Sequence, residues 1–130
     1  MAIDLHEYKK LYLQTSQELL STIKNGLIAM NTNPGDKNVL AEVHRAAHSF
    51  KSQSLVMGYA QLGLCGRVLE ALFLGMKEGS IDPNAELSGI VNETLEAMDT
   101  SLANVRNGQG ELDLSSHISK IENQAGITVH

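Results

Sequence analysis

One stripe of side chains carries the chemistry that this sequence offers. His44, His48, Lys51 and Leu55 follow one another at steps of four, three and four residues, which places them along one face of a helix. An imidazole beside an ammonium group is suited to nucleophilic work on an anionic group, since the cation offsets the incoming negative charge. Small residues next to the stripe, including Ser52, favour access to His48 from outside.

A carboxylate is predicted at the height of His48 on the next helix. If the chain folds back near Gly58, His48 lies ten residues before the turn and Glu70 twelve after it. At ~1.5 Å of rise per residue these are climbs of ~15 Å and ~18 Å, so the two side chains sit nearly level. A carboxylate that accepts a hydrogen bond from Nδ1–H leaves the lone pair on Nε2, the nucleophilic nitrogen.

The chemistry favoured by this trio is reversible phosphorylation of His48. Glu70 would stabilise the positive charge of the modified ring, and Lys51 would offset the phosphoryl charge. The chain lacks the Gly-x-x-x-x-Gly-Lys-Ser/Thr phosphate loop, so the phosphoryl group must come from another domain or protein.

Metal binding is the competing interpretation of the two neighbouring histidines. His44 and His48 have the i, i+4 spacing that places two imidazoles on one metal ion. A metal-dependent oxidase bundle would also need Glu-x-x-His pairs on facing helices, and the sequence has none. We therefore expect no metal and no cofactor, with His44 adjusting the charge or hydration of His48. Cys65, the one cysteine, is expected to fill the core.

Composition and charge restrict the classes of protein that remain. The chain has 130 residues, 42% hydrophobic residues, 4% aromatic residues and two prolines, which favours one all-α domain. The net charge is −5, with +1 on residues 1–60 and −6 on 61–130, so no basic face for nucleic acid is expected. No apolar run reaches the ~20 residues of a membrane span, and the amino-terminus lacks signal-peptide character. These features predict a cytoplasmic location.

Hydrophobic periodicity predicts four long helices and a short fifth, joined by short loops. The expected ranges are 4–30, 37–57, 59–78 and 83–106, with a last helix from about 113 or 115 to 123. Asp36 and Asp82 are the expected N-caps, Asp82 being followed by Pro83 at the first helical position. The expected architecture is an up-down-up-down four-helix bundle spanning residues 1–125, with 126–130 a frayed tail or the start of a linker. The apolar stripe expected on the first helix comprises Leu5, Tyr8, Tyr12, Leu19, Ile23, Leu27 and Met30.

The segment around His48 resembles a known family. His48, Lys51 and Gly58 match the His-x-x-Lys-x-x-x-x-x-x-Gly signature of histidine phosphotransfer (HPt) domains. The stretch 46–59 is similar to the amino-terminal phosphotransfer domain of chemotaxis histidine kinases of the CheA type. Two positions depart from that pattern: Ser52 replaces a common Gly, and Arg67 stands where another His is frequent. Arginine cannot carry a proton, although it can bind phosphate.

The resemblance implies a role for each residue of the trio. His48 would be the phosphoacceptor, Glu70 its hydrogen-bonding partner and Lys51 the basic residue beside the phosphoryl group, with His44, Arg67 and Ser52 accessory. The donor would be a CheA-type ATP-binding kinase domain, and the acceptors would be aspartates of response regulators of the CheY and CheB type. The domain alone would be a monomeric phosphate carrier with no ATP site, although a CheA parent would be a histidine protein kinase. The alternative is a non-catalytic all-α adaptor that binds signalling partners without phosphoryl transfer.

Overall fold

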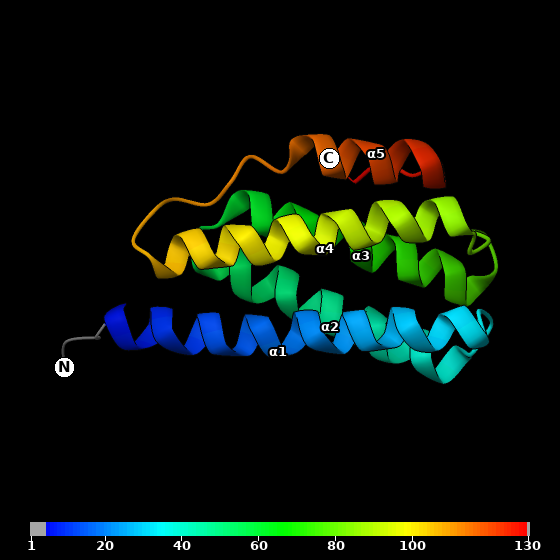
Figure 1. The fold of residues 1–130 in the computed structure, drawn as a ribbon, viewed down its shortest axis with the longest axis horizontal. Coiled ribbons are helices and arrows are strands. Elements are labelled where there is room, and N and C mark those ends of the chain that lie inside the picture. The colour runs from blue at the N-terminus through cyan, green and yellow to red at the C-terminus, as the bar shows by residue number, and fades with distance from the viewer. Residues whose placement is uncertain (1–4, 130) are drawn as a thin grey trace.

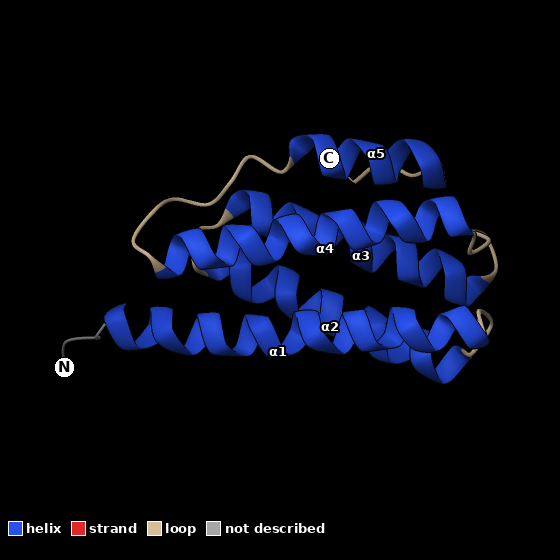
Figure 2. Cartoon of the chain, in the orientation of Figure 1, coloured by secondary structure: helices blue, strands red, loops and turns tan. Residues whose placement is uncertain are grey.

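A computed structural model describes residues 5–129, and within that range the chain forms helices and loops without a strand (Figure 2). Loops of a few residues connect the first four helices, so neighbours run antiparallel and the bundle is up-down-up-down (Figure 1). The predicted all-α bundle with a short fifth helix is confirmed. Residue 4, where the first helix was expected to begin, lies outside the described residues. The helices are α1 (Leu5–Thr32), α2 (Lys37–Val56), α3 (Ala60–Glu78), α4 (Ala85–Arg106) and α5 (Ser115–Ala125).

The core is built from one apolar face of each helix. Its largest side chains are fully buried because residues three or four apart in the sequence face the same neighbour. Cys65 belongs to this core, and burial, with the charge of Glu111, raises the pKa of its thiol to about 12. The predicted structural role of Cys65 is confirmed. Phe50, Phe73, Leu20, Ile23, Leu62, Leu69, Leu95, Met98 and Leu102 are among the buried members.

Two members of the expected α1 stripe are exposed, which corrects the sequence prediction. Leu5 and Tyr8 are 76% and 52% exposed. The reason is length: α1 has 28 residues and α2 has 20, so α1 is longer by ~12 Å and its first turns reach beyond the end of α2 (Figure 1). From Tyr12 onward the predicted stripe faces the core.

One expected helix cap is confirmed and one is wrong. The Asp36 carboxylate accepts hydrogen bonds from the amides of Asn38 and Val39, at 3.0 and 3.3 Å. At the start of α4, Asn84 rather than Asp82 is the N-cap, because its side-chain oxygen accepts a 2.8 Å hydrogen bond from the amide of Leu87. The helix therefore begins at Ala85, two residues after Pro83.

Helices α2 and α3 approach each other closely through two buried glycines. A Cβ at Gly66 would lie 2.8 Å from the N and Cα atoms of Lys51. One turn earlier, a Cβ at Gly63 would lie 2.4 Å from the side chain of Leu55. The close approach requires glycine at position 66, where an added Cβ would meet backbone, whereas at position 63 it would meet a side chain that can rotate away.

The loop between α4 and α5 completes the beginning of α3. The N-cap of α3, Tyr59, supplies no side-chain hydrogen bond. The Glu111 carboxylate instead accepts a 2.9 Å hydrogen bond from the amide of Leu62, and the Gln61 side chain accepts one of 2.9 Å from the amide of Leu114. Amides in the first turn of a helix have no partner within it, so this loop supplies one from elsewhere in the chain.

The segment after α5 is more closely packed than its sequence indicates. The helix continues to Ala125, two residues beyond the expected end. Ile127 and Val129 are partly buried against the core, and the amide of Val129 donates a 2.8 Å hydrogen bond to Glu122. The domain limit at residue 125 stays a prediction.

Candidate functional site

The exposed stripe predicted on α2 is present. The His48 side chain is 58% exposed and the Lys51 side chain 22% exposed. The adjoining positions Ala47, Phe50 and Ser54 are fully buried, which fixes the rotation of α2 about its axis. The same helix thus anchors the core with one face and holds His48 in solvent with the other.

Glu70 joins the two residues of the trio that lie on α2. One carboxylate oxygen, Oε2, is hydrogen-bonded to Nδ1 of His48, and the other, Oε1, accepts a 2.9 Å bond from Nζ of Lys51. The contact between His48 and Glu70 expected from their equal heights is therefore confirmed. The Glu70 side chain is 18% exposed, so it forms the wall of the site and His48 its accessible edge.

The electrostatics keep Glu70 ionised. Partial burial acts to raise the pKa of Glu70, but hydrogen bonds from Lys51 and His48, and their charges, outweigh burial and hold the pKa below its ordinary value. An ionised carboxylate only accepts hydrogen bonds, so Nδ1 of the neutral imidazole must be the donor. Nε2 is then unprotonated and has a lone pair available for attack on an electrophile.

Gly66, which sets the distance between the helices, is not among the site residues predicted from the sequence. Gly66 lies one turn before Glu70 on α3 and meets the backbone of Lys51, one turn after His48 on α2. The close approach at Gly66 therefore brings Glu70 within reach of both α2 side chains. The signal in the sequence is the pair Gly63 and Gly66, two glycines one turn apart in a helical segment.

The three accessory candidates lie around the trio without joining its hydrogen bonds. His44 is half-buried one turn before His48, and Arg67 is exposed on α3 one turn before Glu70. Ser52 is half-buried on α2, one turn after His48. Among residues 5–129, no group of three or more His, Cys, Asp or Glu side chains is arranged to hold a metal ion.

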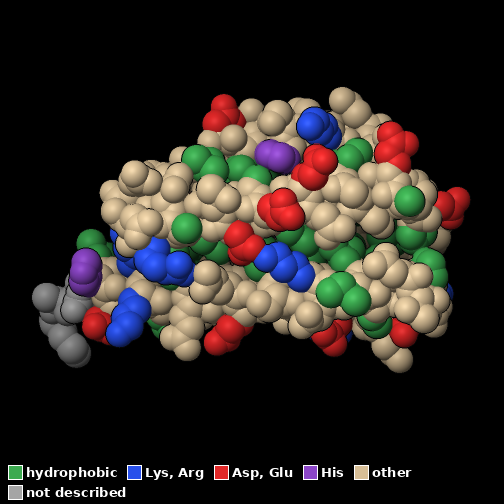
Figure 3. Space-filling model, in the orientation of Figure 1, with side chains coloured by type: hydrophobic (Ala, Val, Ile, Leu, Met, Phe, Trp, Pro, Cys, Tyr) green, Lys and Arg blue, Asp and Glu red, His purple; other side chains and the backbone are tan. Residues whose placement is uncertain are grey.

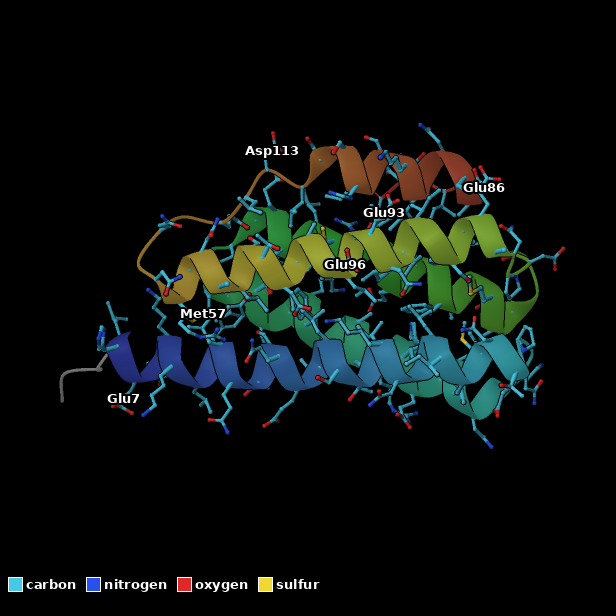
Figure 4. The ribbon with its side chains drawn as sticks, viewed as in Figure 1. Glu7, Met57, Glu86, Glu93, Glu96 and Asp113 are labelled. Atoms are coloured by element: carbon cyan, nitrogen blue, oxygen red, sulfur yellow. The ribbon has the colours of Figure 1, made fainter. Side chains whose placement is uncertain are left out.

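An apolar groove that the sequence analysis did not predict lies beside the stripe. It has a volume of about 320 Å³, and Ser52 places it one turn from His48, on the side of α1. Leu11 and Val56, at its edges, are 60% and 86% exposed. Met57 both packs against the core and lines the groove, beside the start of α1 (Figure 4). We call this surface the apolar groove; its lining is Tyr8, Leu11, Tyr12, Thr15, Ser52, Gln53, Val56 and Met57.

Comparison with known proteins identifies the class to which this fold and site belong. The Hpt domain family matches residues 7–108, which covers α1 from its third residue, the whole of α2, α3 and α4, and both residues of the His48–Glu70 contact. The chain therefore belongs to the Hpt domain family, and it is a two-component phosphotransfer module.

The relatives that this chain matches are chemotaxis proteins named CheA. The chain is 26% identical over 121 residues to the chemotaxis protein CheA of Bacillus subtilis, which covers 92% of this chain and 18% of that protein. It is 19% identical over 118 residues to CheA of Halobacterium salinarum and 23% identical over 109 residues to CheA of Salmonella typhimurium. These matches cover 90% and 84% of this chain, and 18% and 16% of the relatives. The chain thus spans less than a fifth of the length of these relatives.

None of the helices in residues 5–129 combines the length and the apolar character needed to cross a bilayer.

Proposed function

We propose that His48 is the phosphoacceptor of this module: it takes a phosphoryl group from an ATP-dependent histidine kinase domain and passes it to an aspartate of a response regulator. The observation that carries the proposal is the hydrogen bond between Nδ1 of the exposed His48 and a carboxylate that Lys51 also binds. The alternative prediction, an adaptor without phosphoryl chemistry, gives no reason for this arrangement.

The proposed reaction has two displacements at phosphorus. Nε2 of His48 attacks the γ-phosphorus of ATP, a P–N bond forms, and the bond to the ADP oxygen breaks. The ring then carries a positive charge, and Glu70 stabilises it while retaining the hydrogen bond from Nδ1–H. In the second step a carboxylate oxygen of the regulator attacks the same phosphorus, and the P–N electron pair returns to Nε2. Lys51 offsets the charge of the phosphoryl oxygens in both steps.

The partners and setting follow from the relatives. CheA-type kinase domains are the proposed donors, and response regulators of the CheY and CheB type are the proposed acceptors, in chemotaxis-type signalling in the cytoplasm. Within such a protein, residues 1–125 are the proposed phosphotransfer domain, and 126–130 are its tail or the start of a linker. The domain alone is a phosphate carrier, and the kinase activity belongs to the protein that contains it.

The apolar groove is the proposed contact surface for the regulator. A phosphoryl acceptor must bring its aspartate to Nε2 of His48 and will cover the surface within one or two helical turns of it. Val56 lies two turns after His48 on α2, and its exposed side chain gains from burial under a partner.

The test uses two histidines on the same face. We expect that incubation with [γ-³²P]ATP and the kinase domain of Bacillus subtilis CheA labels the parent chain and His44→Gln but leaves His48→Gln unlabelled. The label should be lost in acid and stable in base, as a phosphoramidate is. Equal labelling of His48→Gln and the parent would refute the proposal. The adaptor would be supported by two results together: the chain is never labelled, and a regulator binds the parent and His48→Gln equally well, with or without ATP.

A further inference from the structure

A second surface of the molecule is cationic and lies away from the trio. A cavity of about 860 Å³ opens between the first half of α1 and the end of α4. Figure 3 shows Lys and Arg side chains gathered there, with a His at the tip of α1. On α1 the cavity is lined by Lys10, Leu13 and Gln17, whereas Leu11 and Thr15 of the same helix line the apolar groove. The two surfaces therefore lie on opposite flanks of α1. We call this one the cationic cavity.

The cations of this cavity are not used within the fold. Among residues 5–129, Lys9, Lys10 and Arg106 form no ion pair, whereas Lys24 and Lys51 each bind a carboxylate within 4.0 Å. Glu7 and Glu18 also line the cavity but form no ion pair with these three side chains. With three unpaired cations against two carboxylates, the lining has a net charge of +1 in a chain whose net charge is −5. It produces a local positive potential that attracts an anion.

The length and lining of the cationic cavity indicate the kind of anion. Its lining runs along α1 from residue 6 to residue 21, a rise of ~22 Å at ~1.5 Å per residue. An extended polypeptide covers that length with about seven residues. Gln14 and Gln17 are exposed in the lining and offer amide donors and acceptors to a peptide backbone.

Other anions fit this lining less well. Apart from the His6 imidazole, its described lining has no aromatic ring, so bases would have little stacking surface. Leu13 is its one apolar side chain and is 7% exposed, which leaves little for a lipid chain to bury against. A protein segment rich in Asp and Glu matches both the charges and the amides.

We propose that the cationic cavity binds an extended acidic segment, about seven residues long, of a partner protein. This surface lies outside the trio and the apolar groove, so a bound segment leaves His48 free. The site would hold a partner on this domain without blocking His48, and it functions whether or not His48 is phosphorylated.

The test measures binding of fluorescein-labelled hepta-glutamate by fluorescence anisotropy at moderate ionic strength. We expect binding to the parent chain, with amide chemical-shift changes confined to residues 6–21 and the neighbourhood of Arg106. The triple variant Lys9→Gln, Lys10→Gln and Arg106→Gln should bind at least tenfold more weakly. None of the three forms an ion pair among the described residues and none belongs to the core, so circular dichroism should show an unchanged fold.

The matched control removes three positive charges elsewhere. Lys37→Gln, Lys77→Gln and Lys120→Gln change exposed lysines on α2, α3 and α5 and should weaken binding less than twofold. Equal weakening by both triple variants would show diffuse charge attraction and overturn the proposal, as would shift changes mapping to another face or no binding at all. Inorganic tripolyphosphate binding as tightly as hepta-glutamate would overturn the assignment of a polypeptide.

Discussion

The spacing between α2 and α3 gives the sharpest test of how this fold supports its chemistry. In Gly66→Ala the new Cβ lies 2.8 Å from two backbone atoms of Lys51, whereas ordinary van der Waals contact begins at 3.4 Å. Because both atoms belong to the backbone, no change of rotamer relieves the overlap, and the helices must separate by the missing 0.6 Å. The 2.9 Å bond from Lys51 to Glu70 would then lengthen to about 3.5 Å, the limit of a hydrogen bond. The bond from His48 to Glu70 would weaken for the same reason.

We expect Gly66→Ala to slow phosphorylation of His48 by about 10- to 100-fold, the cost of a misplacement of this size at a reacting group. Overpacking should lower the free energy of unfolding by about 1–3 kcal/mol, which a domain with ~5–15 kcal/mol tolerates. Single-turnover labelling with the kinase domain measures the rate. The ¹⁵N shifts of the His48 ring report whether Nδ1 still holds its proton.

Two other glycines provide controls. Gly89 is exposed on α4 with nothing within 4 Å of an added Cβ, so Gly89→Ala should leave the rate unchanged and add up to about 1 kcal/mol of stability. Gly63→Ala meets the side chain of Leu55, which can rotate away, so its effect on the rate should be several-fold smaller than that of Gly66→Ala. A folded Gly66→Ala protein that is labelled as fast as the parent, with unchanged ¹⁵N shifts, would refute this reasoning.

Three further predictions concern other parts of the site and its supports. Since the pKa of Glu70 is lowered in the folded chain, the stability it contributes is present above the ordinary glutamate pKa of about 4.3 and is lost as the pH falls through the folded value. In urea unfolding, the parent should have a free energy of unfolding about 1 kcal/mol higher than that of Glu70→Gln at pH 5, and this difference should disappear at lower pH. Loss of the difference already at pH 6 would contradict this prediction. Glu111→Ala should lower the free energy of unfolding by about 1 kcal/mol, because the first turn of α3 loses its hydrogen-bond acceptor. Glu111→Gln should keep the cap but lower the pKa of Tyr59, which burial and the Glu111 charge raise, as followed by ultraviolet titration; an unchanged tyrosine titration would exclude the charge effect. Val56→Glu should slow transfer to a regulator about fivefold, whereas Ile28→Glu, also exposed but remote from the groove, should not; equal rates for both would remove the groove from the interface.

The sequence predicted those features that depend on local pattern. Helical periodicity gave the helix limits within about two residues, and Asp36 was found because a capping side chain binds amides two and three residues ahead. The level pairing of His48 and Glu70 needed only the turn near Gly58 and the rise of a helix. The start of α4 was misplaced because Asp82 and Asn84 are both good caps, and only the structure shows which one binds an amide.

Features that depend on the distance between elements could not be predicted from one sequence. The role of Gly66 follows from a backbone contact with a residue fifteen positions away. The capping of α3 by Glu111 joins residues 49 positions apart. The exposure of Leu5 and Tyr8 reflects the unequal lengths of packed helices, since helical periodicity assigns a face but not where the neighbouring helix ends.

The acidic side of the molecule is explained most simply by solvation. Glu86, Glu93 and Glu96 lie along α4 (Figure 4), and all three are exposed. Exposed carboxylates of one sign repel acidic surfaces and attract basic ones, so this face will influence how partners approach.

The hydrogen bond between the Glu111 carboxylate and the start of α3 has a practical consequence for anyone who shortens this protein. The family match ends at residue 108, yet Glu111, in the loop beyond that limit, accepts a hydrogen bond from the first turn of α3, the helix that carries Glu70. Ending the chain at residue 108 would leave the amide of Leu62 without its acceptor. It would also expose the apolar surface that Ile118 and Ile121 now cover. The smallest part of the chain that folds stably is therefore longer than the part that matches the family.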